Sequence, residues 1–479
     1  MLAAADRSSE PMQSMMASAA AGACTGSDDC QGVRYRLAGN PSHVAIVGLG
    51  RSGLSCAEFL AGIGLEVDVY DAQSMPALAG ELQERVPEAR LHSGSIRIDR
   101  WREDSLLVVS PGVPLSHPDL LPLLESGVRP VGDIELFAQC AVAPVIAITG
   151  SNGKSTVTQL TGEMLSAAGL DVRVGGNIGV PVLDLLDLRA DCYVLELSSF
   201  QLETTWSLKP QCATVLNLAA DHMDRYAGMD GYVEAKAKIY HGSGTMLINV
   251  DDERCRALAQ ADRKTLAFSS SAPSTENEYG ILRDGNATWL MRGTAQLADS
   301  ADIRLPGQHN LMNVLAAWAL AHDAGIDDEI IREAAASFCG LPHRMEWLGS
   351  HAGLDWINDS KGTNVGAAAA AIDGLDGPLV LIAGGQGKGA DFAPLAGSLG
   401  EKVRGVVLMG EDADRIAHAI AGSRPVEFAD SMSDAVNLAR SLAQPGDTVL
   451  LSPACASFDM YSGFEARGDD FRRCVEEIA

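Results

Sequence analysis

The sequence predicts an α/β protein of three domains, each built around a mostly parallel sheet. Three stretches repeat one order of features: a short run rich in β-branched residues, a glycine-rich loop and an amphipathic segment. They begin near residues 43, 144 and 379. This order is typical of strand–loop–helix units whose strands run parallel. The length of 479 residues agrees with three domains, because a domain averages roughly 150 residues.

The expected strands coincide with the β-branched runs, at 43–47, 65–70, 144–149, 193–197, 214–217, 246–250, 379–383, 406–409 and 448–451. A helix is expected over 157–165, and another follows His309. Chain breakers at Gly132 and at Gly340-Leu341-Pro342 place the domains at 41–132, 133–340 and 341–479. Residues 1–40 are rich in Ala, Ser, Gly and Met and are expected to form a disordered tail outside the fold.

The composition excludes several classes of function. A net charge of −27 and a pI near 4.6 argue against nucleic acid as a partner, because such binding requires clustered Lys and Arg. Small anionic ligands remain compatible if a few cations gather at their sites. No apolar run approaches the roughly 18 residues of a membrane span, so no membrane insertion is expected. Ten scattered cysteines without a CxxC pair predict free thiols and a cytoplasmic protein.

The central glycine loop has the features of a nucleotide-phosphate site. It follows an expected strand and precedes an expected helix, so backbone N–H groups and the helix N-terminus are available to phosphates. Lys154 is suited to the β- and γ-phosphate oxygens and Ser155 to Mg²⁺. Ile148 stands where the usual pattern has its first glycine, so a coincidental turn is the alternative. The candidate residues are Gly150, Ser151, Asn152, Gly153, Lys154, Ser155 and Thr156.

The first glycine loop resembles a dinucleotide fingerprint. Gly48, Gly50 and Gly53 have the spacing of that fingerprint, and Asp71 follows about 20 residues later. These glycines allow a tight turn and a close approach of the backbone to a diphosphate, which NAD and a UDP group both carry. A tight turn without any ligand is the third interpretation.

Two polar residues at expected strand ends are candidate Mg²⁺ ligands. Glu196 lies near the carboxyl end of the strand expected at 193–197, and His222 lies just beyond another strand. A helix cap or salt bridge is the alternative for Glu196, and a buried, hydrogen-bonded histidine is the alternative for His222. Lys236, taken with its local sequence alone, is expected on a solvated helix face.

Several polar residues near expected strand or helix ends in the last third of the chain suggest a ligand site. Each one alone is compatible with an ordinary loop or a helix cap, but loops at the strand ends of one domain commonly form a binding site. The candidates are Asn313, Arg344, the loop 358–363, Lys388 and the loop 452–457.

Together these motifs resemble the Mur ligases. The resemblance covers about residues 43–477 and depends on the order of its motifs: GLGRSGLS, SPG, GDIELF, TGSNGKST, GGNIG, ELSSFQLE, DHMDRY, GQHN, GLPHR, NDSKGTN, GGQGK and SPACASFD. It implies a Rossmann-like N-terminal domain that binds a UDP substrate. It also implies a central P-loop-like ATPase domain and a Rossmann-like C-terminal domain that binds an amino acid.

The resemblance also implies roles for individual residues. The UDP-substrate site would comprise Arg51, Ser52, Asp71, Ser110, Gly112, Asn177 and Ser198. Asn313, Arg344, Asp359 and Lys361 would join the glycine loop in binding ATP. Two Mg²⁺ ions would be held by Ser155, Glu196, His222 and Lys236, the last carrying a carbamate formed from CO₂. The glutamate pocket would comprise Thr363, Lys388, Ser457, Phe458 and Phe464, and the catalytic residues would be Lys154, Lys236 and His222.

The activity implied is ATP-dependent addition of D-glutamate to UDP-N-acetylmuramoyl-L-alanine, through an acyl phosphate, in peptidoglycan precursor synthesis. L-glutamate or another amino acid is the alternative within this class. A monomer is expected, with domain closure protecting the acyl phosphate from water. A nicotinamide oxidoreductase would leave the central loop unexplained, and a regulatory NTPase would hydrolyse nucleotide without a carboxylate substrate. A folylpolyglutamate synthetase would lack the first glycine loop and Asp71.

Overall fold

The structure is a computed structural model that describes residues 37, 39–221, 223, 225–285, 287–305, 307–375, 377–422 and 424–478. The tail expected at 1–40 lies outside these residues except for 37, 39 and 40, and His222 also lies outside them. The chain forms two compact units. The first runs through Leu282 and includes Met291–Leu297 and Leu315–Ala334. The second comprises Arg283–Leu290, Ala298–Val314 and the chain from Ala335 onward.

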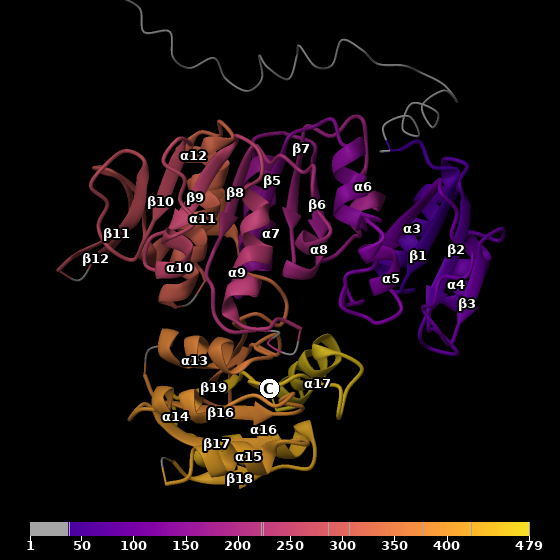
Figure 1. Ribbon diagram of the computed structural model, residues 1–479. Coiled ribbons are helices and arrows are strands. Elements are labelled where there is room, and N and C mark those ends of the chain that lie inside the picture. The colour runs from indigo at the N-terminus through magenta and orange to yellow at the C-terminus, as the bar shows by residue number, and fades with distance from the viewer. Residues whose placement is uncertain are drawn as a thin grey trace, which may run out of the picture. The chain divides into compact units, whose positions relative to one another are not determined.

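The first sheet of unit 1 has four parallel strands in the order β3-β2-β1-β4 (Figure 1). Its strands are β1 (His43–Val47), β2 (Glu66–Asp71), β3 (Arg90–Ser93) and β4 (Ser105–Val109). Its helices are α3 (Arg51–Gly62), α4 (Ala79–Arg85) and α5 (Leu121–Glu125). In chain order, β2 and β3 are added on one side of β1, and β4 is then added on the other side of β1. The carboxyl ends of β1 and β4 therefore meet at a topological switch point, where ligands bind in such sheets.

The second sheet has nine strands in the order β13-β12-β11-β10-β9-β8-β5-β7-β6. Its strands are β5 (Val145–Thr149), β6 (Val172–Gly176), β7 (Cys192–Glu196), β8 (Cys212–Val215), β9 (Thr245–Asn249), β10 (Thr265–Phe268), β11 (Glu278–Asp284), β12 (Ala287–Arg292) and β13 (Ala295–Asp299). The strand β5 pairs in parallel with β7 on one side and β8 on the other. All five residues of β5 are buried, as expected for a strand covered on both faces.

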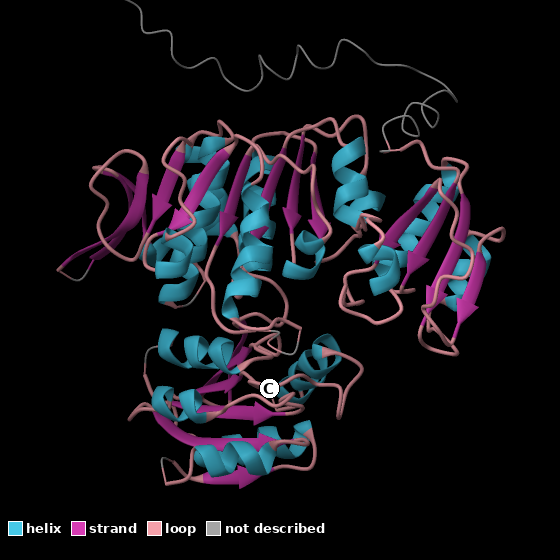
Figure 2. Ribbon diagram, in the orientation of Figure 1, coloured by secondary structure: helices cyan, strands magenta, loops and turns pink. Residues whose placement is uncertain are grey.

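Helices connect the successive strands from β5 to β10, and α7 packs on β5, β6 and β7 (Figures 1 and 2). The helices are α6 (Asp133–Cys140), α7 (Lys154–Ala167), α8 (Ser199–Glu203), α9 (Met229–Ala237), α10 (Glu253–Arg256), α11 (Gln308–Asp323) and α12 (Asp328–Ser337). Short 3₁₀ helices are η2 (Val182–Leu185), η3 (Lys238–Tyr240) and η4 (Ser300–Asp302). Because β5, β7 and β8 are neighbours, the segments after them converge at one edge of the sheet.

The sheet of unit 2 has six strands in the order β14-β15-β19-β16-β17-β18. Its strands are β14 (Glu346–His351), β15 (Leu354–Asn358), β16 (Leu379–Gly384), β17 (Val403–Met409), β18 (Val426–Phe428) and β19 (Thr448–Leu451). Its helices are α13 (Val365–Gly374), α14 (Ala393–Ser398), α15 (Ala413–Ala419), α16 (Met432–Leu442) and α17 (Phe464–Glu476). The strand β14 runs antiparallel to β15, and the pairs from β15 to β18 are parallel. The carboxyl ends of β15, β19 and β16 therefore lie side by side.

The buried cores of both units are mainly aliphatic, as the scarcity of aromatic residues requires. Of the cysteines within the described segments, Cys339 is exposed, and Cys56, Cys140, Cys192, Cys212, Cys255, Cys455 and Cys474 are buried without a disulfide. A search of the described helices for one long and apolar enough to cross a membrane finds none.

The observed elements confirm the α/β prediction and correct several of its boundaries. The strands expected at 43–47 and 448–451 have those bounds. The strand expected at 214–217 is Cys212–Val215, because Leu216 and Asn217 have already left the sheet to meet the glycine loop. The helix expected at 157–165 begins at Lys154 and ends at Ala167. The three sheets fall within 43–109, 145–299 and 346–451. The first sheet and most of the second belong to one compact unit.

Candidate active site

The glycine loop between β5 and α7 contains two backbone conformations that favour glycine. Gly150 has φ +152° and Gly153 has φ +82°, values that L-amino acids with a side chain rarely adopt. A Cβ atom on Gly150 would lie 3.0 Å from the Cβ of Leu216. The loop therefore packs closely against the segment that follows β8. It leads directly into the N-terminus of a 14-residue helix, where N–H groups are available to an anion.

Asn217, which sequence analysis did not identify, anchors this loop. Its Oδ1 accepts from the N–H of Asn152 at 2.8 Å, and its Nδ2 donates to the carbonyl of Asn152 at 3.0 Å. The carbonyl of Asn217 accepts from the N–H of Ser151 at 2.9 Å. The buried hydroxyl of Ser151 contacts the Ala219 carbonyl and the Tyr232 hydroxyl at 2.9 and 3.0 Å. The segment after β8 thus fixes the shape of the loop after β5.

Two lysine side chains converge on the carbonyl oxygen of Gly150. Lys154 Nζ donates to it at 2.8 Å and to the Ser151 carbonyl at 2.8 Å. Lys236 Nζ donates to it at 2.9 Å and to Thr149 Oγ1 at 3.1 Å. Lys154 and Lys236 were both predicted as catalytic residues, and the structure places both amino groups on the same loop.

Lys236 is buried, with only 2% of its surface exposed, which contradicts the solvated helix face expected from its local sequence. It comes from α9, where the ring of Tyr232 lies 4.8 Å from its Nζ. Burial, reinforced by the positive charge of Lys154, holds the pKa of Lys236 well below its ordinary value. Its amino group is therefore far more readily neutral than that of a surface lysine.

The predicted Mg²⁺ ligands Ser155 and Glu196 meet beside the loop. The Ser155 hydroxyl, in the first turn of α7, donates to Glu196 Oε2 at 2.5 Å. Asn177, which follows β6, donates to the other carboxylate oxygen at 2.7 Å. Glu196 ends β7 and is buried. The Glu196 carboxylate thus binds a hydroxyl and an amide on two other elements.

Two further predicted residues, Thr156 and Ser198, follow the strands β5 and β7 in sequence. Thr156 is buried in the first turn of α7. Ser198, predicted for the UDP substrate, caps α8: its hydroxyl accepts from the N–H of Gln201, in a capping box. No cluster of three or more His, Cys, Asp or Glu side chains that could hold a metal is present among the described residues, which do not include His222.

The first glycine loop is tightly packed at the switch point of the four-stranded sheet. A Cβ atom on Gly53 would lie 2.0 Å from the carbonyl oxygen of Gly48. The Gly48 carbonyl accepts from the Ser110 hydroxyl at 2.6 Å. Asp71 accepts from the N–H of Leu49 at 2.7 Å and from the N–H of Gln73 at 2.8 Å. Asp71 and Ser110, both predicted to contact the UDP substrate, therefore also hold the glycine loop in place.

The first turn of α3 connects this loop with the central part of unit 1. Arg51 Nη2 donates to the Gly179 carbonyl at 2.9 Å. Ser52 donates to Asp133, a buried carboxylate whose pKa is raised by desolvation. Gln201 also donates to Asp133, at 3.0 Å. Arg51 and Ser52 were predicted to bind the UDP substrate, and Asp133 was missed because only folding brings its two partners together.

In unit 2, Asp359 lies at the meeting point of β15 and β19. Its Oδ2 accepts from the Ser452 hydroxyl at 2.7 Å, and its Oδ1 accepts from the N–H of Met345 at 3.3 Å. Burial raises the pKa of Asp359 to about 7, against the opposing effects of the Ser452 hydrogen bond and the charge of Arg344. Asp359, Arg344 and Ser452 thus form one polar cluster, as expected for loops at adjacent strand ends.

The predicted glutamate-pocket residues lie in unit 2, on loops and at the start of α17, and two of them have lysines near their rings, one being Lys361, which was predicted for ATP. Lys361 Nζ lies 3.7 Å from the ring centre of Phe464, and Lys388 Nζ lies 5.5 Å from that of Phe458. Phe458 is 64% exposed, whereas Ser457 is buried. The Thr363 N–H donates to the Lys361 carbonyl at 2.7 Å. Asn313, predicted for ATP, donates to Asn310 at 3.1 Å within α11.

Arg467, which no motif predicted, organises these loops. It is buried in α17 and donates to the hydroxyl and carbonyl of Ser360 at 3.0 and 2.8 Å. It also donates to the Cys455 carbonyl at 3.1 Å. Desolvation lowers the pKa of Arg467 to about 10. Its only sequence signal was an arginine within an amphipathic helix, which gives no indication of burial.

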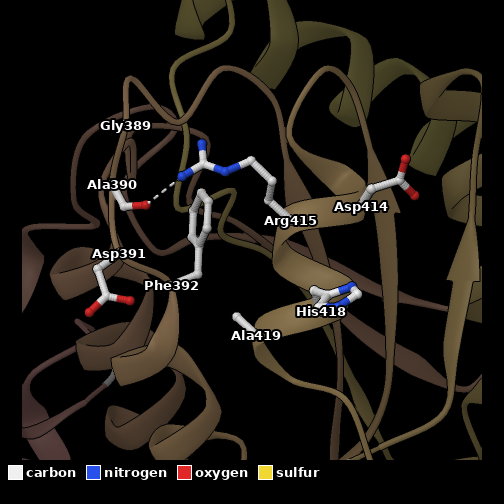
Figure 3. Close-up of a pocket in the computed structure, with 8 residues that line it drawn as sticks. All are labelled: Gly389, Ala390, Asp391, Phe392, Asp414, Arg415, His418 and Ala419. Atoms are coloured by element: carbon white, nitrogen blue, oxygen red, sulfur yellow. Dashed lines mark hydrogen bonds between the residues drawn. The ribbon is translucent and has the colours of Figure 1, made fainter.

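An open hollow of about 710 Å³ lies next to the Lys388 loop, between the segment 389–392 and α15 (Figure 3). Arg415 crosses it: the guanidinium donates to the Ala390 carbonyl at 3.0 Å, lies 5.4 Å from the Phe392 ring centre and pairs with Asp412. The lining is Gly389, Ala390, Asp391, Phe392, Asp414, Arg415, His418 and Ala419. None of the predicted glutamate-pocket residues is among them.

Comparisons with known proteins identify the family. Family models match three segments: "Mur ligase MurD-like, N-terminal domain" over residues 42–132, "Mur ligase middle domain" over 148–321 and "Mur ligase, glutamate ligase domain" over 343–455. A UDP-N-acetylmuramoylalanine–D-glutamate ligase of Nitrosococcus oceani is 51% identical, covering 90% of this chain and 96% of that protein. The ligase of the same name from Marinobacter nauticus is 48% identical, covering 90% of this chain and 98% of that protein.

Solved structures share the fold at low sequence identity. A pseudomurein peptide ligase type C from Methanothermus fervidus has a TM-score of 0.58 at 17% identity, covering 91% of this chain and 100% of that one. The UDP-N-acetylmuramate–alanine ligase of Thermotoga maritima also has a TM-score of 0.58 at 17% identity, covering 91% and 99%. With three domain models matched in order and relatives near 50% identity along almost their whole length, this chain belongs to the Mur ligase family.

Proposed function

We propose that this chain uses ATP to join D-glutamate to UDP-N-acetylmuramoyl-L-alanine, giving UDP-N-acetylmuramoyl-L-alanyl-D-glutamate, ADP and phosphate. Relatives that bear the name of this ligase are 44–51% identical over about nine-tenths of the chain. The reaction belongs to peptidoglycan precursor synthesis, and its need for ATP and a nucleotide sugar favours a cytoplasmic enzyme. We also expect it to act as a monomer.

The observation that carries the proposal is the arrangement around the glycine loop of β5. Lys154 lies against this loop, and Ser155 and Glu196 meet at its edge. A phosphate-binding loop, a cation and a hydroxyl–carboxylate pair are the parts that phosphoryl transfer from ATP requires. The first glycine loop lies in the same compact unit. A nicotinamide oxidoreductase would use the first loop and leave the second without a role.

The chemistry follows from the poor electrophilicity of a carboxylate. The terminal carboxylate of the L-alanyl group attacks the γ-phosphate of ATP, which forms an acyl phosphate and releases ADP. The neutral amine of glutamate then attacks the acyl carbon, and the tetrahedral intermediate expels phosphate as the amide forms. Lys154 supports the first step by stabilising negative charge on the transferring phosphoryl group. The backbone N–H groups at the N-terminus of α7 contribute in the same way.

The residues present fit Mg²⁺. A hydroxyl on Ser155 and a carboxylate on Glu196 are hard oxygen donors, the ligand type that this ion prefers. Their hydrogen bond of 2.5 Å brings the two oxygen atoms close together, which supports a shared ion. Mg²⁺ bound there would neutralise phosphate charge. We assign two Mg²⁺ ions to this site and include His222 among their ligands.

We further propose that Lys236 carries a carbamate. Its neutral amine adds to CO₂ and loses a proton, so that a cationic side chain becomes an N-linked carboxylate. The depressed pKa of Lys236 and its burial beside the loop support this assignment, because only the uncharged amine is nucleophilic. A carboxylate on Lys236 would also relieve its repulsion with Lys154 and supply a further oxygen ligand for Mg²⁺.

The other binding roles are assigned by domain. The UDP substrate is assigned to the segment 41–132 with Asn177 and Ser198, through Arg51, Ser52, Asp71, Ser110 and Gly112. ATP is assigned to the segment 133–340, which includes Asn313. Arg344, Asp359 and Lys361 are assigned to ATP as well. D-glutamate is assigned to the segment 341–479, through Thr363, Lys388, Ser457, Phe458 and Phe464.

Phosphate release measured with ATP, UDP-N-acetylmuramoyl-L-alanine and a panel of D- and L-amino acids tests the proposal. Release should require both organic substrates and should be fastest with D-glutamate. ATP hydrolysis without the UDP sugar would favour a regulatory NTPase. A preference for L-glutamate would retain the mechanism and change the product.

A further inference from the structure

Arg225 joins the loop that follows β4 to the central part of unit 1. Its Nη1 donates to the Pro111 carbonyl at 2.8 Å, and its Nη2 donates to the Val113 carbonyl at 3.2 Å. The same Nη2 donates to Glu203 Oε2, on α8, at 2.6 Å. Three acceptors on two separate segments of the chain therefore converge on one guanidinium group.

The environment of Arg225 holds the guanidinium in one orientation. Its carbon Cζ lies 4.1 Å from the ring centre of Phe200. The side chains of Arg225 and Glu203 are only 11% and 15% exposed. Glu203 is held in turn by the Tyr226 hydroxyl, which donates to its Oε1 at 2.6 Å. A half-solvated surface arginine would lack this combination of stacking, charge neutralisation and shielding from water.

The loop that Arg225 binds determines the shape of the first glycine loop. The Ser110 hydroxyl donates to the Gly48 carbonyl, and a Cβ atom on Gly48 would lie 2.8 Å from Cγ2 of Val113. The backbone of Gly48 therefore packs directly against residues 110–113. A shift of the loop 110–113 would move the glycine loop with it.

We propose that Arg225 is a positioning residue for the UDP-sugar site: by holding the Pro111 and Val113 carbonyls, it fixes the loop against which Gly48 packs. Arg225 acts through the loop and has no assigned contact with a substrate. The inference rests on the proposed function, since it concerns the site of the UDP substrate.

The test compares ligand affinities of full-length variants by calorimetry, with UDP-N-acetylmuramoyl-L-alanine and ADP as separate probes. Arg225→Met keeps the apolar stem that packs on Phe200 and removes the hydrogen bonds. The Kd for the UDP sugar should rise about tenfold or more, and the Kd for ADP should change less than twofold. Arg225→Lys keeps the charge paired with Glu203 but cannot reach both carbonyls, so its Kd for the UDP sugar should rise by an intermediate factor. Arg189→Met removes a charge that is 83% exposed in the same unit and should change neither Kd.

Each outcome decides the inference. Unchanged affinity for the UDP sugar in both Arg225 variants overturns it. Equal weakening of both ligands, together with a lowered Tm, would also overturn it, because that pattern indicates a general structural role. If Arg225→Met fails to fold, the Arg225→Lys variant decides alone by the same criterion. A parent chain that binds ADP but not the UDP sugar would overturn the proposed function, and the inference with it.

Discussion

Lys154 and Lys236 donate to the same acceptor, the carbonyl oxygen of Gly150, at 2.8 and 2.9 Å. Two ammonium groups that share one carbonyl oxygen repel each other, and the repulsion adds to the cost of burying Lys236. The more buried group loses its proton more easily, which is the direction of the Lys236 pKa. Lys236 is therefore the lysine of the pair whose amine is more readily neutral and available for chemistry.

Lys154→Ala should abolish amide formation and ATP turnover while the fold persists. The lost stabilisation of the phosphoryl group is about 3 kcal/mol or more, at least roughly a hundredfold in rate. Steady-state kinetics and a thermal melt check the two parts of this expectation. Lys209→Ala, at an exposed lysine of the same unit, serves as the control. Near-normal turnover by a folded Lys154→Ala variant would remove the loop from the mechanism.

Lys236→Ala should lose most activity, and small carboxylic acids such as acetate or formate should restore part of it. The added acid occupies the place of the carbamate and supplies the missing oxygen ligand. Activity is measured against acid concentration, with Lys154→Ala as the control that no acid should rescue. Full activity of Lys236→Ala without an additive would show that the carbamate assignment is wrong.

Lys388→Ala should raise the KM for D-glutamate about tenfold or more, because a hydrogen bond to a charged group contributes about 1.5–3 kcal/mol. The KM values for ATP and the UDP sugar should move much less. Each substrate is varied in turn. Equal shifts for all three substrates, or none for glutamate, would mean that the pocket is wrongly assigned.

Gly53→Ala should destabilise the chain and weaken UDP-sugar binding, whereas Gly50→Ala should do neither to a comparable extent. The new methyl group on residue 53 would lie 2.0 Å from the Gly48 carbonyl oxygen, a backbone atom that cannot rotate away. The expected cost is about 2 kcal/mol or more. A Cβ atom on Gly50 would meet nothing within 4 Å at an ordinary φ of −91°, so its cost should stay within about 1 kcal/mol. Urea unfolding compares the two variants, and equal costs would contradict the packing argument.

Asp359→Asn should flatten the pH dependence of stability. The native chain keeps the Asp359 proton up to a pKa of about 7, whereas an unfolded chain releases it near pH 4. The native state therefore binds more protons between these values, and the stability contribution of Asp359 falls as pH rises through that window. Relative to the parent, the free energy of unfolding of the Asn variant should rise by about 2 kcal/mol between pH 5 and pH 7.5.

Urea unfolding at both pH values measures this change, with Asp373→Asn, an exposed aspartate of the same unit, as the control. A constant difference between Asp359→Asn and the parent across the window would contradict the prediction.

Local sequence was sufficient for the parts of the site that lie within a few residues of one strand end. The loop at 150–156 and Glu196 could be placed at the edge of a parallel sheet because the loop directly follows a strand-like run and Glu196 lies at the end of another. The order of motifs supplied the family. The burial of Lys236 could not be predicted in this way, because the sequence of α9 gives the helix no distinct apolar face. Only the packing of α9 against the loop buries the amine.

Residues that act through distant partners were missed. Asn217 lies 65 positions from Asn152, and Arg225 lies 112 positions from Val113. Neither has a local pattern that distinguishes it from an ordinary loop residue. The end of β8 was placed two residues late for a related reason: Leu216 continues the apolar run, but Leu216 and Asn217 turn away to bind the glycine loop. Tertiary contacts there override the periodicity.

The buried cysteines determine where oxidants and thiol reagents can act. Burial raises the pKa of the Cys192 and Cys455 thiols to about 12, so almost none of either is present as the reactive thiolate at neutral pH. Within the described segments, only Cys339 presents its sulfur to solvent. Among the described cysteines, peroxide or maleimide should therefore modify Cys339 first, and a fluorescent or spin label at Cys339 leaves the glycine loops and their lysines untouched.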